Sequence, residues 1–216
     1  MVHSFCCTIY SFNLEPMKKT LVLFTTILLA LQMQAQDFVL LDSIKKANAK
    51  VTTLKAHVHN HNKRADKIIE KDGTIEYVSP NKFSAVFEND AYLIVNGNRI
   101  KGNIGIFHGT FKMRNGPLRS LSRAFLYAFQ GRCQDLAEEN NFSLQTKTSE
   151  NFHTVTFTTK KKLLIGIGIK QALLRFGLDD LLIKEIVLID YRGYIDTYTL
   201  VNEKYNEKIE GSKFKI

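Results

Sequence analysis

Hydrophobic and polar residues alternate with a period of two over much of this chain, most clearly from Gly73 to Lys101. Short strand-like runs in this stretch are separated by turn-forming residues. Asp72-Gly73 and Asn96-Gly97 predict tight hairpin turns, because both central residues of a type I′ turn need a positive φ angle. Ser79-Pro80-Asn81 and Glu88-Asn89-Asp90 predict turns between them. The stretch predicts an antiparallel meander whose apolar face needs a cover.

The segment before this meander has a different period. Asp37 to Lys50 carries apolar residues at near-helical spacing with lysines opposite, which predicts an amphipathic helix. From Val51 the period changes to two, which predicts a strand of about 10 residues. Its alternating apolar positions are Leu54, Ala56 and Val58.

Helical spacing returns in the middle of the chain. Gly102 to Met113 predicts irregular structure or short strands, and Arg114-Asn115-Gly116-Pro117 marks a break. A second amphipathic helix is predicted from Leu118 to Gln130, with Gly131 as its cap. Asp135 to Asn140 adds a further helical turn.

Strand patterns resume at Phe142. Asp179-Asp180 and Arg192-Gly193 predict turns between them. Strands are predicted beyond Phe142 at Phe152–Thr159, Ala172–Leu178, Leu182–Asp190 and Tyr194–Asn202. The order of helix, meander, helices and meander predicts a mainly β, α+β fold with about three helices on one sheet face.

Such a sheet either packs shut beneath its helices or leaves an apolar hollow there, and the periodicity leaves both alternatives open. The strand residues come from one face of the first meander, and the helix residues are natural lid contacts. The candidate lining residues are Ile75, Tyr77, Phe83, Ala85, Phe87, Leu121, Phe125 and Phe129.

The N-terminal segment has the features of an export signal. Residues 17–35 contain a basic start, an apolar run from Leu21 to Leu31 and small residues around Ala35, as in a secretory signal peptide cleaved after Ala35. The run is shorter than the roughly 20 residues of a membrane-spanning helix. Residues 1–16 are interpreted as an upstream extension, and residues 36–216 as a single domain.

Cysteine use agrees with a soluble exported chain. Cys6 and Cys7 lie in the segment that is expected to be absent, so Cys133 remains alone and forms no intramolecular disulfide. No cysteine closely follows the apolar run, which argues against a lipid anchor on this chain. We expect Cys133 to be a half-buried structural thiol.

The chain is basic, with a formal net charge of +9. The charge is spread out, and Lys160, Lys161 and Lys162 form its tightest cluster. Without a stacking-aromatic motif this pattern argues against nucleic acid and favours anionic membrane surfaces or acidic proteins as partners.

Candidate catalytic and metal motifs are weak. His57, His59 and His61 share one strand face, but they point away from Leu54, Ala56 and Val58, so a solvated face is preferred over a zinc site. Gly166-Ile167-Gly168 lacks the third glycine and the βαβ context of a nucleotide site. No serine lies in a nucleophile elbow. The sequence predicts no catalytic residue, no metal, no cofactor and no enzyme.

The order of these elements resembles the LolA family of periplasmic lipoprotein carriers, in the form found in Bacteroidetes. Pro80-Asn81-Lys82-Phe83 resembles the family's proline-started strand, and Leu93-Ile94-Val95-Asn96-Gly97 resembles its strand ending in a glycine turn. Asn115-Gly116-Pro117-Leu118 resembles the start of the family's helical insertion. Gly193-Tyr194-Ile195-Asp196-Thr197 and Asn206-Glu207-Lys208-Ile209 resemble the closing part of the fold.

The resemblance implies an unclosed antiparallel half-barrel covered by helices, whose apolar interior binds lipoprotein acyl chains. It implies a monomer in the periplasm that receives cargo from an inner-membrane donor complex and passes it to an outer-membrane acceptor. It also implies an arginine latch immediately before the strand-starting proline. Ser79 occupies that position, and Arg64 or Arg99 could replace the arginine.

Two alternatives on the same fold stay open. One is a sensor or regulatory lipid-binding module that acts through a partner protein. The other is a carrier of a different hydrophobic product, such as a pigment or a polyene lipid.

Overall fold

The computed structural model describes residues 37–216, except residues 89, 105–106, 113–124 and 160–168. The chain divides into two compact units, residues 1–39 and residues 40–216. The fold described below is that of the second unit.

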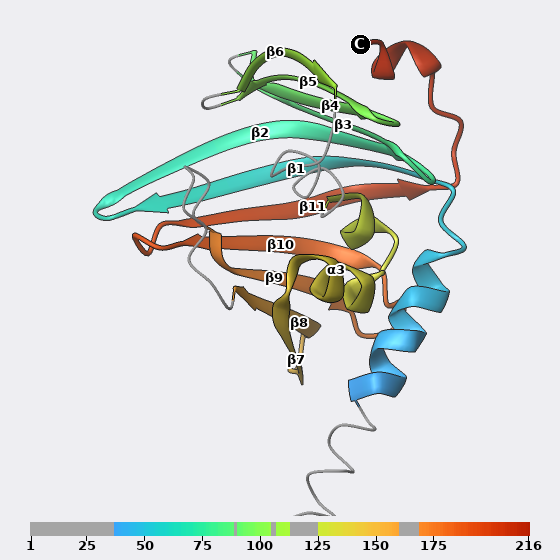
Figure 1. Cartoon of the computed structure of the whole chain (residues 1–216), viewed down its shortest axis with the longest axis vertical. Coiled ribbons are helices and arrows are strands. Elements are labelled where there is room, and N and C mark those ends of the chain that lie inside the picture. The colour runs from blue at the N-terminus through green and yellow to red at the C-terminus, as the bar shows by residue number, and fades with distance from the viewer. Residues whose placement is uncertain (1–36, 89, 105–106, 113–124, 160–168) are drawn as a thin grey trace, which may run out of the picture. The chain divides into compact units, whose positions relative to one another are not determined.

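Eleven antiparallel strands form one open sheet in the order β6-β5-β4-β3-β2-β1-β11-β10-β9-β8-β7 (Figure 1). The first six are β1 (Thr53–Arg64), β2 (Lys67–Val78), β3 (Lys82–Phe87), β4 (Tyr92–Asn96), β5 (Arg99–Ile104) and β6 (Phe107–Lys112). The remaining five are β7 (Phe142–Thr148), β8 (Phe152–Thr159), β9 (Ile169–Gly177), β10 (Ile183–Asp190) and β11 (Ile195–Tyr205). This arrangement confirms the predicted unclosed half-barrel.

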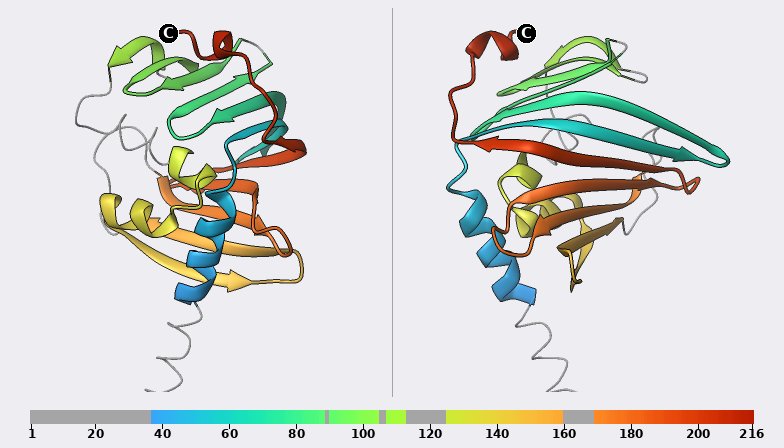
Figure 2. Two further views of the ribbon diagram at one scale, coloured as in Figure 1. Left: turned by 90° about the vertical axis from the view of Figure 1, so that its right-hand side faces the viewer. Right: turned by 180° about the vertical axis from the view of Figure 1, so that it is seen from behind.

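Helical segments accompany the sheet. Residues 40–48 continue a helix that begins at residue 37, and residues 125–129 form a short helical segment. They are followed by α3 (Cys133–Asn140), which contacts β7, and the chain ends after a 3₁₀ turn at Gly211–Phe214. Figure 2 shows α3 and residues 125–129 against the same face of the sheet.

The sheet consists of two meanders that meet at its centre. β1 to β6 follow one another as neighbours, and so do β7 to β11. The first and last strands then pair with each other, for example Leu54 with Tyr205 and Val58 with Leu200. This pairing leaves β6 and β7 as the two edges of the sheet.

Alternation along β1 separates an inner face from an outer face. Leu54, Ala56 and Val58 are buried, whereas Lys55 and His57 are exposed. Because side chains alternate across a strand, the cross-strand partners of the buried residues lie on the same inner face. The core therefore lies between this face and the helical segments.

The Asp72-Gly73 turn prediction is wrong, because Gly73 lies inside β2 and pairs with Val58 on β1 and with Phe87 on β3. A side chain at Gly73 would lie 2.6 Å from Cδ1 of Phe87 and 2.6 Å from the carbonyl oxygen of Val86. The glycine is used for space rather than for a turn conformation.

Other turns lie at or near their predicted positions. The turn between β4 and β5 comes one residue later than predicted, because Asn96 ends β4 and pairs with Arg99, which leaves Gly97, at φ 59°, and Asn98 as the connecting residues. Arg192-Gly193 lies between β10 and β11, with Gly193 at φ 83°. The prediction for Phe152–Thr159 coincides with β8, and Gly131, at φ 63°, follows the helical residues 125–129.

Some predictions fall on parts of the chain that the structure does not describe. They concern the signal peptide and upstream extension, the break before Leu118, the position of Leu121, the lysine cluster and Gly166-Ile167-Gly168. Cys133 is buried rather than half-buried, and burial raises the pKa of its thiol to about 12, which fits a structural role.

Gly73→Ala should lower the free energy of unfolding by about 1–3 kcal/mol, as overpacking typically does. The added methyl group would collide with the Val86 carbonyl, which belongs to the β3 backbone and cannot rotate away. Urea unfolding measures the effect. Gly211→Ala is the control, because a Cβ there would meet no atom within 4 Å; equal stability of the two variants would contradict the explanation.

Candidate functional site

The inner face of β2 and β3 brings together the strand residues that the sequence proposed as lining. Tyr77 pairs with Phe83, and Ile75 pairs with Ala85. Each of these four is at most 4% exposed, and Phe87 is 9% exposed. On the far side of Tyr77 lies Leu54 of β1.

Phe87 extends this apolar surface toward the other meander. Its ring centroid lies 6.1 Å from that of Tyr198 on β11, although β2 and β1 separate these strands in the sheet. The contact is possible because Gly73 leaves the space beside Phe87 free of a side chain. Gly73 in the middle of β2 thus leaves room for Phe87 of the first meander to contact Tyr198 of the second.

Residues 125–129 supply aromatic side chains that stack on β2 and β3. The ring centroid of Phe129 lies 5.5 Å from Tyr77 and 5.5 Å from Phe83, and Phe125 lies 5.5 Å from Phe83 with the two rings inclined by 5°. We call these four residues the aromatic stack. Phe129 is buried and Phe125 is partly buried, so both predicted lid residues contact the predicted strand face.

A hydrogen bond joins the end of this helical segment to the turn between β2 and β3. Nε2 of Gln130 donates to the carbonyl oxygen of Pro80 at 2.6 Å. The neighbouring Ser79, where the family resemblance implies an arginine, donates its backbone N–H to Thr52 at 2.8 Å. The helical segment is therefore joined to the turn between β2 and β3 by Gln130 of the helical segment, not by a side chain at the position of Ser79.

The two arginines that could replace the latch lie elsewhere. Nε of Arg64 donates to Oδ1 of Asn62 at 2.9 Å, and its guanidinium lies 5.8 Å from the ring centroid of Tyr194. Arg99 lies on β5, opposite Asn96 and Lys112. The sequence missed Gln130, because its bond to Pro80 spans 50 residues.

The inner face becomes polar further along β1. Asn60 and Asn62 are each only 8% exposed. Nδ2 of Asn60 donates to the carbonyl oxygen of Thr197 at 3.2 Å, and Nδ2 of Asn62 donates to the carboxylate of Asp196. Asn62 therefore bridges Arg64 and Asp196. This polar end was also missed, because its contacts join β1 to β11.

Burial dominates the electrostatics of this polar end. Desolvation raises the pKa of Asp196, and the nearby charge of Asp190 raises it further, while Arg64 and Lys71 act in the opposite direction. Burial likewise raises the pKa of Tyr198 above its usual range. The polar end is thus a low-dielectric environment in which an ionised Asp196 is disfavoured.

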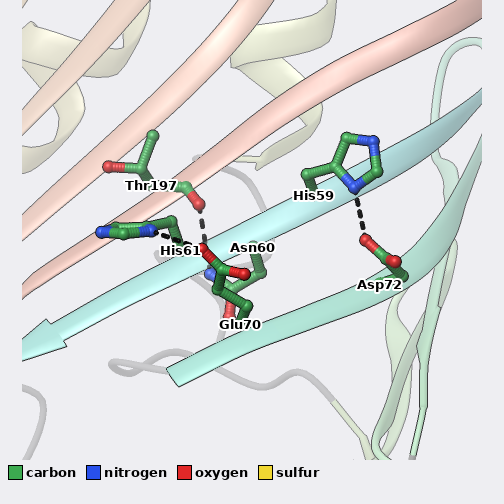
Figure 3. Close-up of polar contacts among 6 residues, drawn as sticks. All are labelled: His59, Asn60, His61, Glu70, Asp72 and Thr197. Atoms are coloured by element: carbon green, nitrogen blue, oxygen red, sulfur yellow. Dashed lines mark hydrogen bonds and ion pairs between the residues drawn. The ribbon is translucent and has the colours of Figure 1, made fainter. Parts of the chain in front are cut away.

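The outer face of β1 carries the three histidines, as predicted. His59 contacts the carboxylate of Asp72, and Nδ1 of His61 lies 3.4 Å from Oε1 of Glu70 (Figure 3). These side chains are 45–78% exposed and line a shallow hollow of about 270 Å³. This agrees with a solvated strand face.

No group of three or more His, Cys, Asp or Glu side chains within the described ranges is arranged to hold a metal ion. Among the helices of the same ranges, none is long and apolar enough to cross a membrane.

Comparisons with known proteins identify the fold. No protein-family model matches the sequence, and no curated protein matches it. An uncharacterized conserved protein from Thermus thermophilus is similar, with a TM-score of 0.50, 10% identity, and coverage of 85% of this chain and 94% of that chain. The likeness concerns the fold alone.

Two further structures have the same kind of similarity. A LolA superfamily protein from Nitrosomonas europaea has a TM-score of 0.43, 6% identity, and coverage of 82% of this chain and 96% of that chain. The Mycobacterium tuberculosis lipoprotein LppX has a TM-score of 0.43, 18% identity, and coverage of 81% and 98%. The Bacteroidetes form of the family stays a prediction.

Gln130→Ala should loosen residues 125–130 without unfolding the sheet. One exposed hydrogen bond contributes about 0.5–1.5 kcal/mol, so amide exchange in this segment should accelerate by up to about tenfold while global unfolding changes little. Hydrogen exchange read by mass spectrometry measures the effect. Gln145→Ala on the exposed side of β7 is the matched control. Unchanged exchange in residues 125–130 would show that the bond to Pro80 does not hold the segment.

Asp196→Asn should change how stability depends on pH. Because the folded pKa of Asp196 is raised, its stabilising contribution is full below its unfolded pKa and is lost as the pH rises through the folded value. Asparagine does not ionise and loses no such contribution. The melting temperature of the variant minus that of the original protein should therefore increase as the pH rises from the unfolded pKa of Asp196 to its folded pKa. Melting curves from pH 3 to pH 8 test this, and a pH-independent difference would contradict it.

Proposed function

We propose that this protein is an exported carrier that buries the acyl chains of lipoproteins, or of a related lipid, beneath residues 125–130. It carries them across the periplasm toward the outer membrane, from an inner-membrane donor complex to an outer-membrane acceptor, as a monomer. The signal-peptide pattern of residues 17–35 and the family resemblance support the location and the partners. The aromatic stack is the observation that carries the proposal.

The aromatic stack joins two parts of the chain, and the strand part is held in place by more hydrogen bonds than the helical part. Tyr77 and Phe83 lie on neighbouring strands within a continuous ladder of backbone pairs. Phe125 and Phe129 come from five helical residues, and among the described residues a side-chain hydrogen bond from Gln130 to Pro80 ties the end of this segment to the strands. Residues 125–130 can therefore separate from the strands at a small cost in hydrogen bonds.

Acyl chains have enough apolar surface to replace this contact. Burying a phenylalanine is worth about 1.5–3 kcal/mol and each methylene about 0.8 kcal/mol, so one chain of about 16 carbons gains about 12 kcal/mol. That exceeds the contribution of Phe125 and Phe129 together, while Leu126, Tyr127 and Ala128 of the same segment are also buried and add to the cost of separating it from the strands. Release then needs an acceptor with a higher affinity for the same chain, and no chemical step is needed.

Native mass spectrometry of the mature protein, purified from the periplasm in which it is made, tests the proposal. We expect bound lipid mass, and uptake of a fluorescent diacyl lipopeptide by the delipidated protein. Protein free of lipid that also fails to take up the lipopeptide would refute the carrier. A bound pigment or polyene would indicate the other cargo, and a stable complex with a membrane protein without transfer would indicate the sensor.

Phe125→Asp should impair lipid uptake more than folding. A charge beside Phe83 opposes burial of an acyl chain, so the affinity for the diacyl lipopeptide should fall by at least about tenfold, or about 1.4 kcal/mol. Because Phe125 is only partly buried, the melting temperature should fall by a few degrees.

Val86→Asp is the matched control. Val86 is 45% exposed and lies on β3 between Ala85 and Phe87, so its side chain points to the other face of the sheet. The control should keep both its fold and its lipid uptake. Equal losses of uptake and stability in Phe125→Asp would place Phe125 in a closed core.

A further inference from the structure

Tyr77 combines complete burial with an unpartnered hydroxyl group. The residue is 0% exposed, and within the part of the chain that the structure describes its hydroxyl oxygen has no hydrogen-bond partner. The great majority of buried polar side-chain atoms do have a partner, and a missing one costs stability. A phenylalanine here would fill almost the same volume without that cost.

The surroundings of Tyr77 are apolar. Its cross-strand neighbours on β1 and β3 are Leu54 and Phe83, and its ring stacks on Phe129. An enclosed water molecule needs two to four polar partners to be held, and these neighbours offer none through their side chains. None of these three side chains could help to hold a water molecule against this hydroxyl.

We propose that the Tyr77 hydroxyl donates a hydrogen bond to the acyl carbonyl oxygen of an ester- or amide-linked cargo chain. The inference rests on the proposed carrier function and names the group by which the same site would recognise its cargo. When a chain takes the place of Phe129 against Tyr77, its first carbon is a carbonyl whose oxygen accepts hydrogen bonds. The bond satisfies both buried groups at once, and a plain hydrocarbon offers no such acceptor.

Tyr205 is the internal reference for this inference. Its hydroxyl is also buried without a partner among the described residues, and it lies on the other side of Leu54. Tyr205, however, has charged surroundings. Nζ of Lys184 lies 5.9 Å from its ring centroid, and Glu203 and Asp180 help burial to raise the pKa of its hydroxyl. Only Tyr77 belongs to the aromatic stack.

The test compares Tyr77→Phe with Tyr205→Phe, using two probes. One is a diacylglyceryl lipopeptide, which carries ester carbonyls. The other is its dialkyl ether analogue, which has the same chain lengths and no ester carbonyls. We expect Tyr77→Phe to weaken binding of the ester probe about five- to tenfold and to leave the ether probe unchanged. Tyr205→Phe should leave both affinities unchanged.

Thermal unfolding of the lipid-free proteins gives an independent readout. Tyr77→Phe should raise the melting temperature, because it removes a buried hydroxyl that has no partner. A lower melting temperature would reveal a partner in the lipid-free state and overturn the inference.

The binding results separate the inference from the function on which it rests. Equal weakening of both probes by Tyr77→Phe, or no weakening of either, would overturn the role of the hydroxyl while leaving the carrier in place. Failure of the unaltered protein to bind either probe would overturn the carrier function, and the role of Tyr77 with it.

Discussion

The pairing of β1 with β11 is the interaction on which the rest of the structure depends. Each meander forms from neighbours in sequence, but only the pairing of the first strand with the last makes one sheet of eleven strands. It also places Tyr77 and Tyr205 on either side of Leu54. A shift of one residue in this register would turn Tyr205, the partner of Leu54 on β11, to the outer face.

Local periodicity predicted most of the fold because every strand except at the β1–β11 junction pairs with its neighbours in sequence. The strand Phe152–Thr159 and the Gly97 turn follow from alternation and backbone conformation within a few residues. The same reasoning failed at Gly73, since a glycine can provide either a positive φ angle or an empty volume. What decides between them is the ring of Phe87 on the next strand.

The candidate site was predicted in part for a related reason. Alternation on β2 and β3 puts Ile75, Tyr77 and Phe83 on one face regardless of their partners, so that face could be predicted from the sequence. The contact between Asn62 and Asp196 joins residues 134 positions apart, and the Gln130 bond to Pro80 spans 50. Contacts of this kind depend on strand register and helix position, which a local pattern does not contain.

Chemistry along β1 limits where hydrocarbon can lie on the inner face. From Leu54 to Val58 the face is apolar, whereas Asn60 and Asn62 are buried with their amide groups bonded to β11. Hydrocarbon that displaced these bonds would leave amides and the Asp196 carboxylate without partners, which costs several kcal/mol. At Tyr77 the situation is reversed, because its hydroxyl has no bond to lose. Along this inner face, polar groups that already have hydrogen-bond partners exclude apolar cargo. The unpartnered hydroxyl of Tyr77 can instead donate a hydrogen bond to a carbonyl group of the cargo.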